Sequence, residues 1–572
     1  MIENALLQFG LFAVVTMILA VPLSYLFTYL FATEASGGGH GFRPVERIIE
    51  IVVGPQIHQK QNWREYLFSL LVFNAVGALV LYFILRYQGH FPWNPQGFGD
   101  LPAPLAFNIT ISYLADTGWQ SYPGESTLSF FSQMFALTSQ NFLSCATGLG
   151  VSFVIARAFV QKENGALGNF YADVARATIY ILLPMMIVFA LFLVWQGSPQ
   201  NMISSVPVTT LDGGHQAIAQ GPVASQVAIK ILGANGGGFF NVNGAHPYEN
   251  PTPLADLIQM VAILVIPIAL VLSFGQMVGD KRQGWTLFCG MTVLFLLLVA
   301  ICSYTESMPH PGYSALNIDQ HITDINPGGN MEGKEARFGI FNSALWTVAT
   351  TSTTQGSVNS MIDSYMPLSA IVPLLNVLVG EVIYGGVGYG RYGVLIYAII
   401  TVFIAGLKVG RTPEYLGKKI EANEVRLAGL VILIVPLCVL GLSVVSLLTS
   451  HGAASITADG PHGLTQTVYA YASSAGNNGT AFNGFNSNTT YQNIILGLVI
   501  LIGRFGVIIP ALAISGSLAI KKIVPPSTGT FPTQGPMFVI LLTTVIILFG
   551  GLVYFPVLAL GPIAEHLSLF AH

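Results

Sequence analysis

The sequence predicts an all-α membrane protein of ten transmembrane helices. A unit of helix, re-entrant loop and helix is repeated four times in it, with one extra span at each end. The chain of 572 residues is 53% hydrophobic and only 8% charged, with a mean hydropathy of +0.65, whereas soluble domains carry roughly a quarter charged residues. Four glycines, Gly118, Gly236, Gly356 and Gly479, follow one another at intervals of 118, 120 and 123 residues. Such a regular spacing indicates an internal repeat.

Ten apolar runs come near the length of about 20 residues that a membrane-spanning helix needs. The first run has no basic leader and is too long for a signal-peptide core, so it is typical of a retained span. The seventh run is interrupted by glycines and is counted once. The runs cover residues 6–31, 66–85, 128–159, 179–194, 254–277, 285–302, 368–407, 427–448, 494–518 and 537–560.

The repeat divides the chain into six parts. Residues 1–62 hold the first span with its loop, and residues 523–572 hold the last span. The four pore units between them cover residues 63–160, 161–280, 281–410 and 411–522. In each unit a short apolar segment, predicted to be a re-entrant helix, leads to the glycine. These segments cover residues 103–114, 223–232, 338–350 and 464–471.

The loop of the second unit contains the clearest sign of non-helical backbone. Gly236, Gly237 and Gly238 are consecutive, and each glycine costs about 1 kcal/mol inside a helix, so they indicate non-helical backbone. At membrane depth such backbone is tolerated only where protein buries it or where it lines a watery cavity. Carbonyl oxygens that replace the water around a cation meet this condition. We interpret the loop as one quarter of a potassium-channel-like selectivity filter, completed by the three equivalent loops.

The candidate potassium-binding residues gather around the four glycines. One such loop alone is equally typical of an ordinary external turn, and it is the register of four that favours a filter. Asp116 is the one acidic residue among them, so carbonyl coordination is favoured over a calcium-type carboxylate site. In the fourth loop both Gly476 and Gly479 are candidates, and equal spacing favours Gly479. The candidates are Asp116, Thr117, Gly118, Gln120, Asn235, Gly236, Gly237, Gly238, Thr354, Gln355, Gly356, Ser357, Gly476, Asn477, Asn478 and Gly479.

Two of the charges inside the apolar runs stand apart. Arg504 lies in the middle of the ninth run, and Glu381 precedes a glycine cluster, Gly385 to Gly390, that breaks the seventh. A charge at the bilayer centre costs about 2.5–3.5 kcal/mol, so each should face a cavity or a partner. One interpretation is a structural ion pair. We favour an ion path below the filter, with Arg504 as a cation barrier, Glu381 as an ion-attracting group and the broken helix as a candidate gate.

Charge placement predicts the orientation. The net charge of −4 gives no sign of a nucleic-acid partner. If the filter loops face outward, most of the 22 Lys and Arg residues lie on the cytoplasmic side. Only Arg86, Lys230, Lys334 and Arg337 then fall outside. This is the expected positive-inside bias, and it also places both termini outside.

Several longer runs of residues resemble a known family, the potassium-binding (KdpA) subunits of the bacterial Kdp potassium-transporting ATPases, from end to end. The most specific are Gly-Pro-Val-Ala-Ser-Gln at 221–226, Asn-Gly-Gly-Gly-Phe-Phe-Asn at 235–241, His-Pro-Tyr-Glu-Asn-Pro at 246–251, Asn-Met-Glu-Gly-Lys-Glu at 330–335, Gly-Arg-Thr-Pro-Glu-Tyr-Leu-Gly-Lys-Lys at 410–419 and Gly-Arg-Phe-Gly-Val-Ile-Ile-Pro at 503–510.

The resemblance implies the potassium-selecting subunit of an ATP-driven, high-affinity importer in the bacterial inner membrane, with the filter on the periplasmic side. It also implies partners: the P-type ATPase KdpB, which binds ATP and Mg²⁺ and hydrolyses the nucleotide, and the small proteins KdpC and KdpF of the same complex. Potassium would pass from the filter to KdpB through an intersubunit tunnel. This chain would need no cofactor of its own, and K⁺ would be its transported ligand.

The motifs agree with this division of labour. The sequence has neither an Asp-Lys-Thr-Gly phosphorylation motif nor a phosphate-binding Gly-x-x-x-x-Gly-Lys-Ser/Thr loop, so we expect it not to be an enzyme by itself. An autonomous potassium channel or a Trk/Ktr-type transporter subunit shares the fourfold pattern and is the alternative. A secondary transporter of an organic solute is disfavoured, because its inverted repeats would alternate in orientation.

Overall fold

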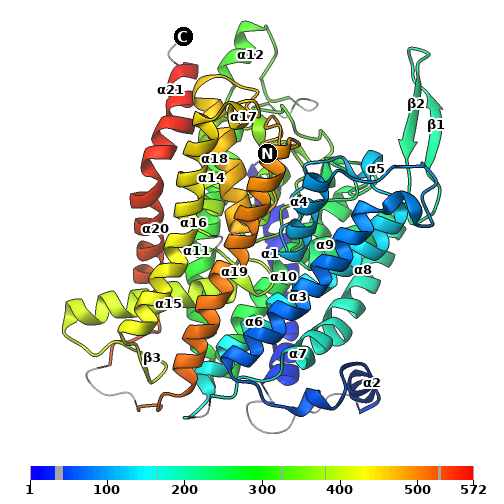
Figure 1. The fold of residues 1–572 in the computed structure, drawn as a ribbon. Coiled ribbons are helices and arrows are strands. Elements are labelled where there is room, and N and C mark those ends of the chain that lie inside the picture. Colours follow the sequence, from blue (N-terminus) through cyan, green and yellow to red (C-terminus); the bar gives the residue numbers. More distant parts are fainter. Residues whose placement is uncertain are drawn as a thin grey trace.

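The computed structural model describes residues 2–32, 43–163, 165–323, 326, 328–380, 382–525 and 530–570. Ten helical segments among these residues are long and apolar enough to cross a membrane, which confirms the predicted number. They form one elongated bundle with loops at both ends (Figure 1). The spans are α1 (Ile2–Phe31), α3 (Trp63–Arg86), α6 (Ser139–Val160) with the π-helical turn Ser132–Thr138, α7 and α8 (Phe170–Arg176 and Leu183–Gln196), α10 (Pro253–Met277), α11 (Lys281–Glu306), α15 (Tyr389–Val409), α16 (Ala422–Leu448), α19 (Thr490–Ala519), and α20 with α21 (Pro536–Leu558 and Ala564–Phe570).

Four spans, α6, α10, α15 and α19, make up the inside of the bundle. In α6 and α10, 89% of the most apolar window is buried, and in α15 and α19 the share is 72% and 56%, whereas it is 17% to 50% in the other six spans. Each inner helix is the second span of one predicted pore unit. The outer spans expose apolar side chains such as Leu79 and Leu552, as contact with lipid requires.

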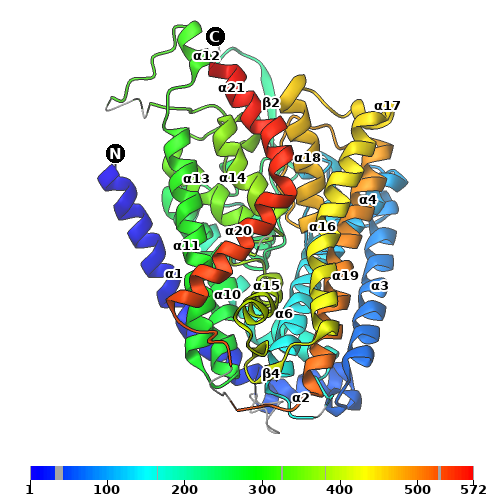
Figure 2. The ribbon, with the colours of Figure 1, turned by 90° about the vertical axis from the view of Figure 1, so that its left-hand side faces the viewer.

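Four shorter helices enter the bundle from one end without crossing it (Figures 1 and 2). The first two begin and end at the predicted residues, and the other two differ from the prediction at their ends. The fourth is longer than predicted, because it begins at Gly460 and includes Gly476. The helices are α4 (Ala103–Leu114), α9 (Val223–Leu232), α13 (Gly339–Thr351) and α18 (Gly460–Gly476).

The seventh apolar run is broken, as its glycines predict. Helix α14 (Pro367–Leu378) stops partway, and α15 begins only at Tyr389, after Gly388 in a positive-φ conformation of 102°. The two halves point in different directions. In Figure 1 α15 runs across the lower part of the view, and in Figure 2 it is seen along its axis.

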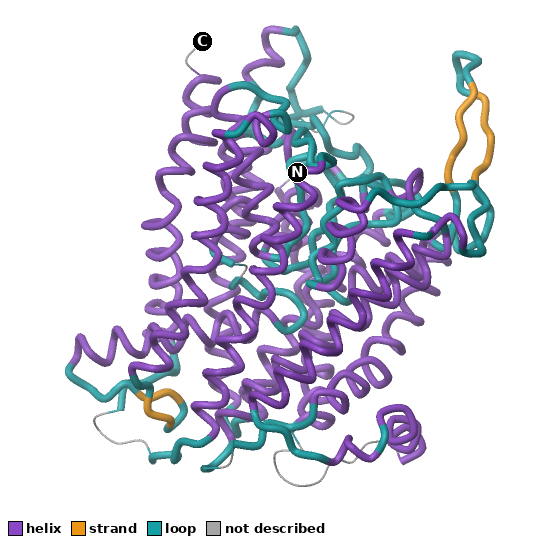
Figure 3. The backbone as a smooth tube through the Cα atoms, viewed as in Figure 1, coloured by secondary structure: helices purple, strands orange, loops and turns teal. Residues whose placement is uncertain are grey.

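The remaining elements lie at the two ends of the bundle (Figure 3). An unpredicted antiparallel hairpin, β1 (Ser205–Thr209) with β2 (His215–Ala219), projects from the end that carries the short helices and the two chain ends, and Ser205 pairs with Ala219. The other end carries α2 (Arg43–Val53) and the hairpin β3 (Glu414–Tyr415) with β4 (Lys418–Lys419). The unit boundaries at residues 63, 161, 281, 411 and 523 stay a prediction. Two π-helical turns, Ala177–Leu182 and Ala559–Ile563, lie inside spans, where they join α7 to α8 and α20 to α21. Short turns complete the list: α5 (Gly124–Thr127), α12 (Pro311–Ala315), α17 (Ser450–Ala453) and the 3-10 turns Pro55–His58, Gln88–His90, Asn243–Ala245 and Ile362–Ser364.

Candidate functional site: a ring of backbone carbonyls

The four glycine loops meet at one place inside the bundle. A methyl group added to Gly236 would lie 2.6 Å from the carbonyl oxygens of both Thr117 and Gln355, and 3.0 Å from that of Asn478. These three oxygens come from the first, third and fourth loops. A single residue of the second loop therefore lies against all three other loops. In each of them, the group that faces Gly236 is the carbonyl of the residue directly before the repeat glycine.

The same contact recurs around the ring. Methyl groups on Gly118, Gly356 and Gly479 would overlap the carbonyl oxygens of Asn235, Asn478 and Thr117, respectively. All four glycines have positive φ angles, of 65°, 75°, 72° and 97° in chain order, a conformation that only glycine adopts at little cost. Two separate reasons thus require glycine at each position: the positive φ angle, and the neighbouring carbonyl that leaves no room for a side chain. The four carbonyls before the glycines belong to Thr117, Asn235, Gln355 and Asn478.

Three of the four short helices end in the same way. A residue two positions before the repeat glycine takes a left-handed conformation, and the next amide bonds back to a carbonyl five residues earlier, as in a Schellman motif. This repeated ending resolves the fourth loop: Gly479 occupies the equivalent position, and Gly476 is the last residue of α18. The left-handed residues are Asp116, Ala234 and Asn477, and the amide bonds join Thr117 to Ser112 (2.9 Å), Asn235 to Lys230 (3.0 Å) and Asn478 to Ser473 (2.9 Å).

Side chains join neighbouring loops. Gln120 of the first loop donates to the Gly238 carbonyl over 2.9 Å and accepts from the Gly238 amide over 3.0 Å. Asn477 of the fourth loop donates to the Thr117 hydroxyl over 3.1 Å. Asn478 donates to carbonyls of the third unit, at 3.0 Å to Thr350 and 2.7 Å to Thr353. Neighbouring loops are therefore held in register by side chains of three predicted residues, Gln120, Asn477 and Asn478. The Gly238 carbonyl accepts one of these inter-loop hydrogen bonds.

The third loop is held by its own side chains. The Gln355 side-chain oxygen accepts hydrogen bonds from the Thr350 hydroxyl (2.8 Å), the Ser357 amide (3.0 Å) and the Ser357 hydroxyl (2.6 Å). The indole of Trp346 donates to the Ser357 carbonyl over 2.9 Å. The side chains of Gln355 and Ser357 thus form hydrogen bonds within the third loop. The Gln355 carbonyl belongs to the ring, and the Ser357 carbonyl accepts the bond from Trp346 in α13.

A cavity lies directly above the ring, and all four loops line it. Its walls include Gly118 and Gln120 of the first loop, and Gly237, Gly356 and Gly479 of the other three. An ion that reaches the ring from this end meets residues of every unit. The arrangement suits a permeation path that starts at the end of the bundle carrying the short helices.

The buried Arg504 finds its partner in the first loop. Its Nη2 lies 3.7 Å from the Asp116 carboxylate and donates to the Ser144 carbonyl over 3.3 Å. Asp116 also accepts hydrogen bonds from the Ser144 hydroxyl (3.0 Å) and the Asn235 side chain. The Asp116 carboxylate is therefore occupied behind the ring and joins the first two loops to α19. Glu381 lies outside the described residues.

Two lysines that the charge count places outside are in fact buried in the protein. Lys230 donates to the Gly238 carbonyl over 2.5 Å. Lys334 forms an ion pair of 2.6 Å with Glu306 at the end of α11, and both side chains are fully buried. Hydropathy did not reveal the burial of either lysine, because only the tertiary fold brings each ammonium to its oxygen partner.

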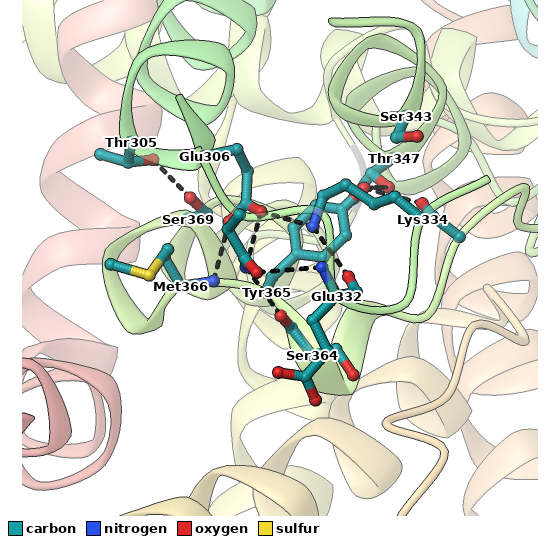
Figure 4. A network of polar contacts seen from close by, with 12 residues as sticks. Thr305, Glu306, Glu332, Lys334, Ser343, Thr347, Ser364, Tyr365, Met366 and Ser369 are labelled. Carbon is teal, nitrogen blue, oxygen red and sulfur yellow. Dashed lines mark hydrogen bonds and ion pairs between the residues drawn. The ribbon is translucent and has the colours of Figure 1, made fainter. Parts of the chain in front are cut away.

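The pair of Glu306 and Lys334 braces the third unit (Figure 4). Glu306 accepts from the Met366 amide over 2.8 Å, just before α14 begins. The Lys334 ammonium lies 4.2 Å from the ring centre of Tyr365. The Tyr365 hydroxyl in turn lies 2.8 Å from the hydroxyl of Thr347 in α13. One buried network thus connects α11, α13 and the outer half of the broken helix.

The break in the seventh run touches the third loop directly. The Gly385 amide donates to the Ser352 carbonyl over 2.9 Å. Gly386 packs so closely on Thr354 that any side chain on it would overlap the threonine. The candidate gate and the candidate filter are therefore in contact, and in the described part of the break this contact is with the third loop.

Comparison with known proteins identifies the family of this chain. The family model described as potassium-transporting ATPase A subunit, KdpA, matches residues 10–567. The chain belongs to the KdpA family. A relative from Rhodospirillum centenum, named potassium-transporting ATPase potassium-binding subunit, is 51% identical over 99% of this chain and 97% of its own length. A relative of the same name from Brucella anthropi is 49% identical over 99% of this chain and 98% of its own.

A solved structure of a different transporter shares the fold of this KdpA-family chain. It is the crystal structure of the potassium transporter TrkH from Vibrio parahaemolyticus, which aligns with a TM-score of 0.50 and 15% sequence identity. The alignment covers 88% of this chain and 96% of that one. The likeness confirms the predicted channel-like helical architecture.

Proposed function

We propose that this chain is the potassium-selecting and potassium-binding subunit of an ATP-driven, high-affinity potassium importer in the bacterial inner membrane. The observation that carries the proposal is the ring formed by the carbonyls of Thr117, Asn235, Gln355 and Asn478 around the four glycines. Carbonyl oxygens from four directions replace the water of a cation without adding a fixed negative charge. Because one chain supplies all four, the filter is complete in a single copy.

The candidate residues take different roles in this proposal. The backbone of the four loops binds K⁺, while the side chains of Asp116, Gln120, Asn477 and Asn478 hold that backbone in place. Arg504, fixed below the ring by its bonds to Asp116 and Ser144, acts as a cation barrier. Glu381 attracts ions below the filter, and the break that follows it serves as the gate.

ATP hydrolysis belongs to a partner in this proposal. The names of the relatives describe a potassium-binding subunit of an ATPase, and this sequence has no phosphorylation or nucleotide-binding motif. We therefore assign ATP and Mg²⁺ to the P-type ATPase KdpB, with KdpC and KdpF completing the complex. The end of the bundle that carries the short helices faces the periplasm, in agreement with the positive-inside rule.

Two measurements test the proposal. The first is ATP hydrolysis by the complex purified through this chain, titrated with K⁺, Rb⁺ and Na⁺. We expect hydrolysis stimulated by K⁺ and not by Na⁺. The second is ⁸⁶Rb⁺ uptake into liposomes that contain this chain alone. Uptake by the isolated chain, without a copurifying ATPase, would instead favour the autonomous channel or Trk/Ktr-type transporter.

A further inference from the structure

A second buried arginine lies deeper in the bundle than Arg504. Arg391, in the first turn of α15, is only 1% exposed. Its Nη2 donates to the Ser273 hydroxyl over 2.6 Å, and its Nη1 lies 3.4 Å from the Ser152 carbonyl. The guanidinium carbon is 4.8 Å from the ring centre of Phe153. The groups in direct contact with this cation are therefore neutral.

No acidic side chain among the described residues forms an ion pair with Arg391, and its Nε has no hydrogen-bond partner there. Arg157, the neighbouring buried arginine of α6, shows the usual alternative, because Asp173 pairs with it at 2.8 Å. A buried charge at membrane depth is costly, and where it occurs it marks an ion pathway or a field that acts on one. Within the described part of the chain, the positive charge of Arg391 thus has no acidic partner.

Arg391 lies where three of the four inner helices meet. It belongs to α15, Ser152 and Phe153 belong to α6, and Ser273 belongs to α10. The fourth inner helix, α19, supplies Arg504, which also contacts α6, at Ser144. Both arginines therefore approach the same inner helix from the side of the bundle interior.

The two contacts on α6 set the spacing of the arginines. Ser144 and Ser152 are eight residues apart, which corresponds to about 12 Å along a helix. The Ser144 contact lies beside Asp116, the residue before the ring residue Thr117, and the Ser152 contact lies about two turns farther along α6, away from the ring. A cation that moved straight inward from the ring would pass Arg504 first and Arg391 next.

We infer that Arg391 is a second cation barrier, in series with Arg504, that closes the straight path from the filter to the opposite membrane face. A fixed positive charge in a narrow path excludes cations by repulsion and offers no carboxylate to replace their water. The inference rests on the proposed function, since ATP-driven accumulation of K⁺ is useful only if the ion cannot return along the axis. Two barriers in series keep the axis closed when either one is disturbed.

The test measures passive leak of the reconstituted complex. Liposomes loaded with K⁺ and lacking ATP are assayed for ⁸⁶Rb⁺ uptake with the wild type, with Arg504→Gln and with Arg391→Gln/Arg504→Gln. We expect Arg504→Gln alone to leak within about twofold of the wild type, because Arg391 remains. The double variant should leak at least tenfold more. Arg391→Lys in the Arg504→Gln background keeps the charge and should stay as tight as Arg504→Gln alone.

Two outcomes overturn the inference. One is a double variant that assembles fully, judged by size-exclusion chromatography, and is as tight as the wild type. The other is an Arg504→Gln variant that already leaks as much as the double variant. If the glutamine pair does not assemble, Arg391→Met/Arg504→Met provides the same comparison with uncharged, unbranched apolar side chains. A wild-type complex without K⁺-stimulated ATP hydrolysis would refute the proposed function itself, which separates the two failures.

Discussion

A single methyl group on Gly236 should disturb three quarters of the carbonyl ring at once. In Gly236→Ala the new carbon would lie 2.6 Å from the carbonyl oxygens of Thr117 and Gln355 and 3.0 Å from that of Asn478, whereas ordinary contact begins at 3.4 Å. The first two oxygens must therefore move by about 0.8 Å and the third by about 0.4 Å. Displacements of this size spoil a site whose ligands have to match the radius of one ion.

The control separates the clash from backbone strain. Gly236 has a φ of 75°, and alanine in the left-handed region costs about 1–2 kcal/mol by itself. Gly97 has nearly the same angle, 69°, and a methyl group there meets nothing within 4 Å. Gly97→Ala therefore carries the strain without the overlap and lies outside the ring.

The assay is K⁺-stimulated ATP hydrolysis by the purified complex, with the K⁺ concentration for half-maximal rate as the readout. We expect Gly236→Ala to raise that concentration at least tenfold, equivalent to about 1.4 kcal/mol of binding free energy, and to reduce discrimination against Na⁺. Gly97→Ala should match the wild type. An intact Gly236→Ala complex with unchanged half-saturation and selectivity would show that the ring does not select the ion.

Two further predictions concern the braces outside the ring. Lys334→Met leaves the buried Glu306 carboxylate unpaired, which typically costs about 3–5 kcal/mol. It should therefore lower the melting temperature of the complex more than the double variant Glu306→Gln/Lys334→Met does. Equal melting temperatures of the two variants would mean that the pair is not coupled. Hydrogen bonds to Asp363 and Glu565 raise the pKa of His462 from 6.5 to about 10. Because the folded pKa is raised, the stabilisation by His462 is complete below pH 6.5 and is lost as the pH rises through 10. The melting temperatures of wild type and His462→Gln should therefore differ most below pH 6.5 and converge above pH 10, and a gap that does not change with pH would contradict this assignment.

The parts of the fold that local sequence determines were predictable. Prolines near the start of the first two short helices and glycine-containing turns after them mark their ends, and α4 and α9 agree with the prediction residue for residue. The start of α18 was missed because the prediction began at the first apolar run, whereas Pro461 in the first turn marks the true start at Gly460.

Long-range partners were beyond the sequence. Arg504 and Asp116 lie in different units at opposite ends of the chain, and nothing in the neighbourhood of either residue indicates the other. The burial of Lys334 was hidden for the same reason, since its partner Glu306 belongs to another segment. Lys230 contacts the Gly238 carbonyl of the loop that follows its own helix, and only the folded shape of that loop brings the two together. Sequence periodicity located the four loops, but only the fold shows which groups hold them together.

All four loops contribute a carbonyl to the ring, but the backbone that leads into the third loop differs from that of the other three. Three loops follow a left-handed residue, Asp116, Ala234 or Asn477, and the third loop does not. The third is also the loop in contact with the break before α15, through the bond of Gly385 to Ser352. A movement of the broken helix would therefore reach the filter through the loop that lacks the shared backbone ending. Such a movement would shift one ring oxygen, that of Gln355, relative to the other three and so change the cation site from one side.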